Sequence, residues 1–169
     1  MDTIIGIDLG TTNSAVSVIR DGLPVMLQAA DGQPVLPSVV GLDGEGRLLV
    51  GQTARNQYVL APDRTVKSVK RKMGQDVKLP LGPQQYTPQE ISAMILRTLK
   101  EQAERALGHP VRKAVITVPA FFNETQREAT RAAGDLADLE VVRIINEPTA
   151  AALVYEPQSD RHERLLVYD

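Results

Sequence analysis

The 169-residue chain has no cysteine and only two histidines. Without cysteine it can form no disulfide, no thiolate metal site and no cysteine nucleophile, and two histidines are too few for a histidine-rich metal centre. Any metal is therefore expected on oxygen ligands. No hydrophobic run approaches the 18 apolar residues of a membrane-spanning helix. The N-terminus also lacks the basic and apolar regions of a secretory signal, which predicts a cytoplasmic protein.

The chain also has no large excess of charge of one sign, because it contains 19 lysines and arginines and 21 acidic residues, for a net charge of -2. We therefore expect neither nucleic acid nor an anionic membrane as a partner, and any anionic ligand must be bound by local groups. The composition, 43% hydrophobic and 24% charged, is close to that of ordinary globular domains and excludes a disordered chain.

Several familiar catalytic motifs are missing as well. No Gly-Lys dipeptide exists, which excludes a Walker loop, and the glycines of 44–51 do not have the dinucleotide-binding spacing. His162 and Glu163 are not followed by the second histidine of a zinc protease, and no Gly-x-Ser-x-Gly elbow occurs. Metalloprotease and serine-hydrolase functions are therefore excluded.

The first part of the chain has short apolar runs separated by turns, at 3–9, 14–19 and 25–27, which predict strands joined as antiparallel hairpins. A different pattern starts at Thr87. Thr87 and Glu90 form a capping box with a proline between them, and the apolar spacing predicts a helix that ends at Gly108. Further elements are then expected in this order: a strand at 114–118, a helix from Asn123, a strand at 141–145, a helix from Asn146 and Pro148, and a strand at 165–168.

This order predicts an α/β fold in which a mixed sheet carries helices on both faces. It fits a ribonuclease-H-like sheet and not a Rossmann sheet, which begins with alternating strands and helices. The intervening residues hold a weaker pattern of strands at 38–42 and 48–50 and a short helix at 52–60. We interpret 37–85 as a small inserted α+β subdomain, and 1–36 with 86–169 as the core subdomain.

The most informative segment follows the first predicted strand, which ends at Asp8. A tight turn at Gly10 would let successive backbone amides point at one anion, and Asp8 beside them offers an oxygen that suits Mg²⁺, bound through water. This pattern predicts a phosphate site. The alternative is an ordinary hairpin turn. The residues of the predicted phosphate turn are Gly10, Thr11, Thr12 and Asn13.

Three groups of charged residues leave alternatives open. The basic cluster that contains Lys70 is either a solvated helical face or a source of a cation for a phosphoryl group. Glu147 is either a helix cap or a functional carboxylate. Asp169 ends an apolar strand as Asp8 does, so the two carboxylates are candidates for a shared metal. The members of the basic cluster are Lys67, Lys70, Arg71 and Lys72.

The sequence closely resembles the seventy-kilodalton heat-shock chaperones of the DnaK type, through segments 5–14, 114–120, 143–152 and 167–169. The phosphate turn is shared in looser form with actin and sugar kinases, whereas 146–152 is more specific to the chaperones. The resemblance implies the first lobe of an actin-like ATPase domain that binds ATP or ADP with Mg²⁺.

The resemblance also implies roles for single residues. Lys70 matches the lysine that orients the γ-phosphate and the attacking water, and Glu147 matches the carboxylate near that water. Pro119 and Arg127 match a proline switch and its arginine partner, although Pro119 is also explained as a strand terminator. Asp169 matches the first residue of the second phosphate loop, and so a catalytic and metal-binding position.

The chain stops at Asp169, so we expect the family's second lobe, adenosine pocket and peptide-binding domain to be missing and the 169 residues alone to be inactive. The resemblance implies a parent chaperone that couples ATP hydrolysis to binding and release of unfolded polypeptides, helped by a J-domain cochaperone and a nucleotide exchange factor. The alternatives are a nucleotide-independent interaction module and an actin-like or sugar-kinase relative.

Overall fold

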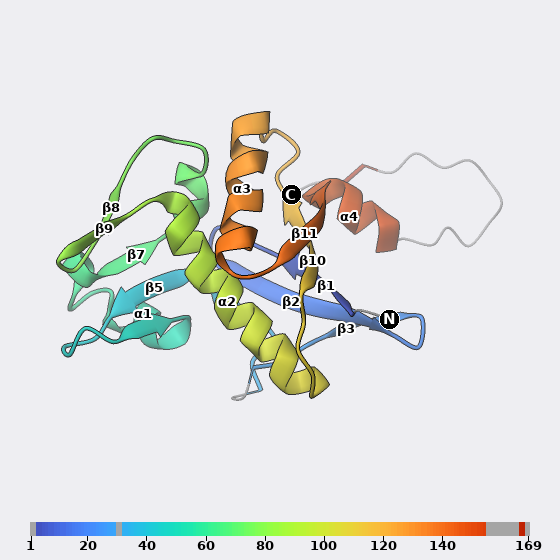
Figure 1. Ribbon diagram of the computed structural model, residues 1–169, viewed down its shortest axis with the longest axis horizontal. Helices are drawn as coiled ribbons and strands as arrows, with labels where there is room; N and C mark the ends of the chain where they lie inside the picture. Colours follow the sequence, from blue (N-terminus) through green and yellow to red (C-terminus); the bar gives the residue numbers. More distant parts are fainter. Residues whose placement is uncertain (1–2, 30–31, 155–165, 168–169) are drawn as a thin grey trace.

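The computed structural model describes residues 3–29, 32–154 and 166–167 (Figure 1). Asp169 and both ends of the strand expected at 165–168 lie outside the described residues, so that strand stays a prediction. No helix in the described ranges is both long and apolar enough to cross a membrane.

A mixed sheet forms the centre of the molecule, with the strand order β11-β10-β1-β2-β3 and the short β4 paired to β2. β1 pairs in parallel with β10, and β10 with β11, whereas β2 and β3 follow β1 as antiparallel hairpins. The hairpins predicted from the first three apolar runs are confirmed. The strands are β1 (Ile4–Asp8), β2 (Asn13–Arg20), β3 (Leu23–Met26), β4 (Leu36–Pro37), β10 (Lys113–Val118) and β11 (Glu140–Asn146).

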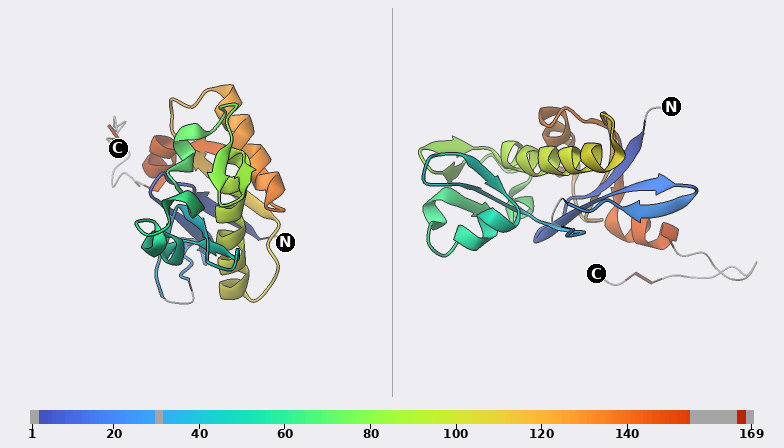
Figure 2. Two further views of the ribbon diagram at one scale, coloured as in Figure 1. Left: turned by 90° about the vertical axis from the view of Figure 1, so that its left-hand side faces the viewer. Right: turned by 90° about the horizontal axis from the view of Figure 1, so that it is seen from below.

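Helices cover both faces of this sheet, as predicted. α2 (Pro88–Leu107) and α3 (Glu124–Leu136) lie side by side on one face, and α4 (Glu147–Val154) packs against β10 and β11 on the other (Figure 2). Buried and partly exposed residues alternate along β10, so every second side chain points to the face of the sheet that α2 and α3 cover.

α2 begins and ends as its sequence predicts. The Glu90 amide donates to the Thr87 hydroxyl at 3.3 Å, and the Glu90 carboxylate accepts from the Thr87 amide at 2.7 Å. Gly108 ends the helix in the left-handed conformation, with φ 75°. Ile91, Ile95 and Leu99 are fully buried, and burial of each contributes about 1.5–3 kcal/mol to folding.

α3 starts at a second capping box, in which Asn123 and Gln126 exchange hydrogen bonds of 3.0 Å. The helix predicted from Asn123 is therefore confirmed. It approaches β11 closely at Gly134, where an added Cβ would lie 2.2 Å from the Val141 side chain. A larger residue there would push the helix off the sheet.

Residues between β4 and α2 form smaller elements at one end of α2 (Figure 1). A three-stranded sheet has the order β6-β5-β7, and β8 pairs with β9 as a hairpin. The predicted strands around 38–42 and 48–50 and the short helix are present, but the helix ends at Gln57 and not at 60. The β8–β9 hairpin was not predicted. The elements are β5 (Val39–Leu42), β6 (Leu48–Val50), α1 (Gln52–Gln57), η1 (Pro62–Arg64), β7 (Thr65–Lys67), η2 (Val69–Lys72), β8 (Leu79–Leu81) and β9 (Gln84–Tyr86).

The inserted elements share one continuous hydrophobic core with the main sheet, through residues such as Val40 and Met73. The subdomain limits at 37 and 85 stay predictions of the sequence. Because β1, β10 and β11 run parallel, their carboxyl ends meet at one edge of the sheet. The turn into β2 and the start of α4 lie at that edge, and they place the site described next.

Candidate functional site

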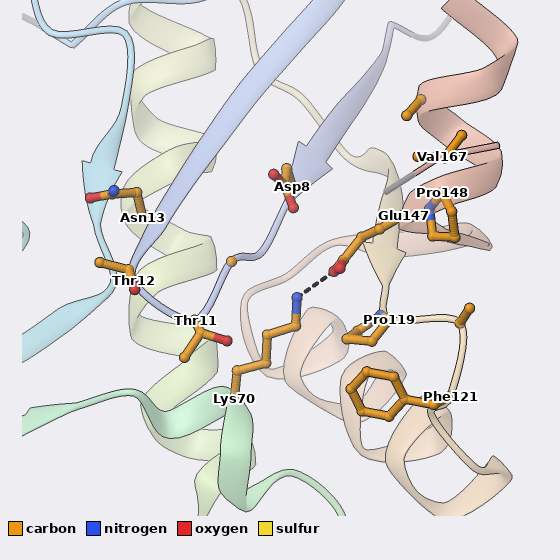
Figure 3. A pocket seen from close by; sticks show the side chains of 13 residues that line it. Asp8, Thr11, Thr12, Asn13, Lys70, Pro119, Phe121, Glu147, Pro148 and Val167 are labelled. Atoms are coloured by element: carbon orange, nitrogen blue, oxygen red, sulfur yellow. Dashed lines mark hydrogen bonds and ion pairs between the residues drawn. The ribbon is translucent and has the colours of Figure 1, made fainter. Parts of the chain in front are cut away.

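A cavity of about 810 Å³ opens at the carboxyl ends of β1, β10 and β11 (Figure 3). The inserted segment closes one side of it through Lys70, and α4 closes another through its first residues. The structure brings eight of the sequence-predicted site residues to the lining of this cavity: Asp8, Gly10, Thr11, Thr12, Asn13, Lys70, Pro119 and Glu147.

The predicted phosphate turn connects β1 to β2 at this cavity. A Cβ on Gly10 would lie 2.0 Å from the carbonyl oxygen of Asn13, so no other residue fits this turn. The Thr11 side chain points toward Lys70, whereas the Asn13 side chain points away from the cavity (Figure 3). The turn therefore presents backbone and threonine side chains to the cavity.

Asp8 stands at the end of β1, exposed in the cavity wall. Its Oδ1 accepts a hydrogen bond of 3.0 Å from the hydroxyl of Thr117, which lies opposite Asp8 in the parallel β1–β10 register. A fixed carboxylate of this kind suits Mg²⁺ held through water. Three or more carboxylate or histidine side chains do not cluster anywhere in the described part of the chain, and Asp169, the other predicted metal ligand, lies outside it.

Lys70 and Glu147 form an ion pair across the cavity (Figure 3). Lys70 comes from η2 and is only 7% exposed, and Glu147 is the first residue of α4. A buried ammonium is expensive unless it is paired, so this carboxylate is what permits the cation at the site. The pair brings an ammonium group close to Thr11 at the cavity wall, with its charge balanced by the Glu147 carboxylate.

The sequence allowed two interpretations of the basic cluster around Lys70, a solvated face or a cation for a phosphoryl group, and its members differ in which they fit. Arg71 and Lys72 are exposed, and the Lys67 ammonium lies 4.0 Å from the centre of the Tyr58 ring. Only Lys70 of this cluster lines the large cavity. The reason is the tight 3₁₀ turn of η2, which points successive side chains in different directions.

Pro119 lies at the cavity wall directly after β10, but Arg127 does not line the cavity. The Arg127 guanidinium donates to the Phe122 carbonyl at 3.1 Å and to the Asn146 side-chain oxygen at 2.8 Å. It therefore braces the residue before Glu147. The sequence identified Asn146 only as the start of a helix, and no local pattern indicated its contact with α3.

The comparison with known families agrees with this geometry. The family model described as Hsp70 protein matches residues 4–81 and 76–169. This chain belongs to the Hsp70 family. The resemblance to the seventy-kilodalton heat-shock family is thereby confirmed, and the mixed sheet with its helices fits the actin-like ATPase lobe of Hsp70. The match favours the Hsp70 chaperones over actin-like filament proteins and sugar kinases as relatives.

Proposed function

We propose that this Hsp70 chain forms the phosphate-binding wall of an ATPase site. The observation that carries the proposal is the convergence of three elements on one cavity: a turn that only glycine permits, a carboxylate at a strand end, and a buried lysine paired with a glutamate. Backbone amides and a lysine ammonium are the groups that bind phosphate oxygens in many nucleotide sites.

The chemistry of each side chain suggests a different role at the site. The ammonium of Lys70 has three N–H donors, so it can hold Glu147 and still donate to a terminal phosphate oxygen. Glu147 is an acceptor that can orient a water molecule for in-line attack, because phosphoryl transfer depends on positioning and charge stabilisation. Asp8 would hold Mg²⁺ through water, and Mg²⁺ when bound neutralises phosphate charge.

The type of chaperone, its activity and its partners are proposed from the family. We propose a DnaK-type chaperone in which ATP hydrolysis drives binding and release of unfolded polypeptides, with a J-domain cochaperone and a nucleotide exchange factor as partners. The 169 residues supply one wall of the cleft. Base, ribose and half of the phosphate contacts are expected from an opposite wall, so we expect these residues alone to bind ATP weakly and to turn it over negligibly.

Nuclear magnetic resonance tests this proposal on the 169-residue chain, titrated with Mg²⁺ and either ATP or inorganic tripolyphosphate. The amide signals of Thr11, Thr12 and Asn13 should shift with both ligands, at millimolar concentrations. Lys70→Ala should weaken binding about tenfold, the loss of one charged hydrogen bond, and Lys72→Ala, an exposed neighbour, should not. Shifts confined to other regions would refute the site, and micromolar affinity or measurable turnover would contradict the weak-binding expectation.

A further inference from the structure

The phosphate turn is held from behind by one residue of the inserted segment, Ser38. This serine follows β4 and is 2% exposed. Its hydroxyl donates to the carbonyl of Gly10 at 2.8 Å, and its amide donates to the carbonyl of Thr12, also at 2.8 Å. Two carbonyls of the turn therefore point at the same residue.

A second buried serine sets the direction of these bonds. The hydroxyl of Ser14, which is 1% exposed, lies 2.8 Å from the hydroxyl of Ser38. A hydroxyl carries a single proton, and that of Ser38 is directed to the Gly10 carbonyl. Ser14 is therefore the donor to Ser38, and the two serines form a chain that ends on the turn.

The geometry of the peptide group converts these bonds into an orientation of amides. In a planar trans peptide the C=O and the following N–H point in opposite directions. The carbonyl of Gly10 faces Ser38, so the N–H of Thr11 points away from Ser38. The carbonyl of Thr12 also faces Ser38, so the N–H of Asn13 points away from it as well.

Ser38 is not among the residues that line the large cavity. It lines a second, smaller cavity of about 280 Å³ together with Thr11 and Thr12, and these two threonines line the large cavity as well. The turn therefore borders both cavities, and Ser38 lines only the smaller one. An amide of the turn that points away from Ser38 is thus free to face the large cavity.

We propose that Ser38 is a positioning residue that aims the amides of Thr11 and Asn13 at the phosphate ligand, with Ser14 supporting it. This inference rests on the proposed function of the same site. It also gives the inserted segment a second role there, since the segment supplies both the cation Lys70 in front of the turn and the brace Ser38 behind it.

The test compares Ser38→Ala with a matched control, Ser17→Ala, in the 169-residue chain. Ser17 also donates to a glycine carbonyl, that of Gly6 at 3.4 Å, but it lies away from the turn. Ser38→Ala removes the bond to the Gly10 carbonyl and keeps the backbone bond to the Thr12 carbonyl. It should weaken binding of Mg²⁺-tripolyphosphate about tenfold and reorient the N–H vector of Thr11 but not that of Asn13, measured by residual dipolar couplings in the free protein. Ser17→Ala should change neither, and Ser38→Thr, which keeps the hydroxyl, should restore both.

The outcomes separate this inference from the proposed function. Equal tripolyphosphate binding by folded Ser38→Ala and the unsubstituted chain would overturn the positioning role alone, even if the melting temperature fell. No binding by the unsubstituted chain would overturn the proposed function and this role with it. If Ser38→Ala does not fold, Ser14→Ala replaces it: a loss of about threefold is expected, and an unchanged affinity would refute the inference.

Discussion

The main sheet with its helices and the inserted segment are stabilised in different ways. α2 alone is 20 residues long, begins with a capping box and buries an aliphatic face. The strands of the inserted sheet have only three or four residues, and no helix there exceeds six residues. Such short elements bury too little to be stable alone.

Side-chain hydrogen bonds to neighbouring segments make up part of this deficit. The amide of Gln57, at the end of α1, donates to the Leu42 carbonyl and the Thr65 hydroxyl, both at 3.0 Å. The Thr65 hydroxyl in turn donates to the Ala61 carbonyl at 2.9 Å. The comparison teaches that long apolar elements stabilise the scaffold, whereas the segment that carries Lys70 and Ser38 adds specific polar contacts to its share of the common core.

The largest effect is expected in the core under α2. Leu99 is fully buried, and Leu99→Ala should lower the free energy of unfolding by about 2–5 kcal/mol, because it removes apolar contacts and leaves a cavity. Leu60→Ala is the control in the inserted segment, since Leu60 is 90% exposed, and it should change stability by less than about 0.5 kcal/mol. Urea denaturation measures both. Equal effects would show that the exposed fraction of a leucine does not set the loss of stability.

The ion pair that joins the inserted segment to α4 comes next. Glu147→Ala leaves the Lys70 ammonium buried without its carboxylate and should cost about 2–3 kcal/mol. Combining it with Lys70→Met should recover most of the loss, since an apolar chain needs no counter-charge. A double-mutant cycle followed by thermal unfolding measures the coupling. Additive losses would mean that the two charges do not depend on each other.

A polar contact within the inserted segment should matter less, and locally. Gln57→Ala removes three hydrogen bonds, the third of them to the Arg64 carbonyl at 3.4 Å, and should cost about 1–2 kcal/mol. Hydrogen exchange should become faster in β5 and β7 but not in β10. The control is Gln52→Ala, whose amide bonds only to the exposed Asn56 in the same helix. Uniformly faster exchange across both regions would indicate that they unfold as one unit.

The smallest effect is a pH dependence at the start of α2. Hydrogen bonds from the backbone and hydroxyl of Thr87 hold the pKa of Glu90 below its usual value of 4.5. The stability from this cap is therefore complete above pH 4.5 and is lost as the pH falls through the lower pKa of the folded state. Glu90→Gln should remove the dependence at a cost of about 0.5–1 kcal/mol for an exposed cap. The free energy of unfolding is measured at several pH values between pH 3 and pH 6. The same dependence on pH in both proteins would refute the prediction.

Much of the scaffold was predictable because its signals are local. The capping boxes of Thr87 and Asn123 each lie within four consecutive residues, and the apolar spacing that follows Thr87 extends over the whole helix. The inserted segment was predicted less well. β7 and the β8–β9 hairpin were missed, because strands of three residues carry too little alternation to stand out.

The same division applies to the site. The sequence by itself determined the tight turn after β1, because Gly10 and the residues around it are neighbours in the chain and their steric demands are local. Only the tertiary structure decided which charges meet there: Lys70 and Glu147 are 77 residues apart, and Asp8 and Thr117 are 109 apart. The distant pairs depend on strand register and on how η2 packs against α2, which are properties of the assembled core and not of any single segment.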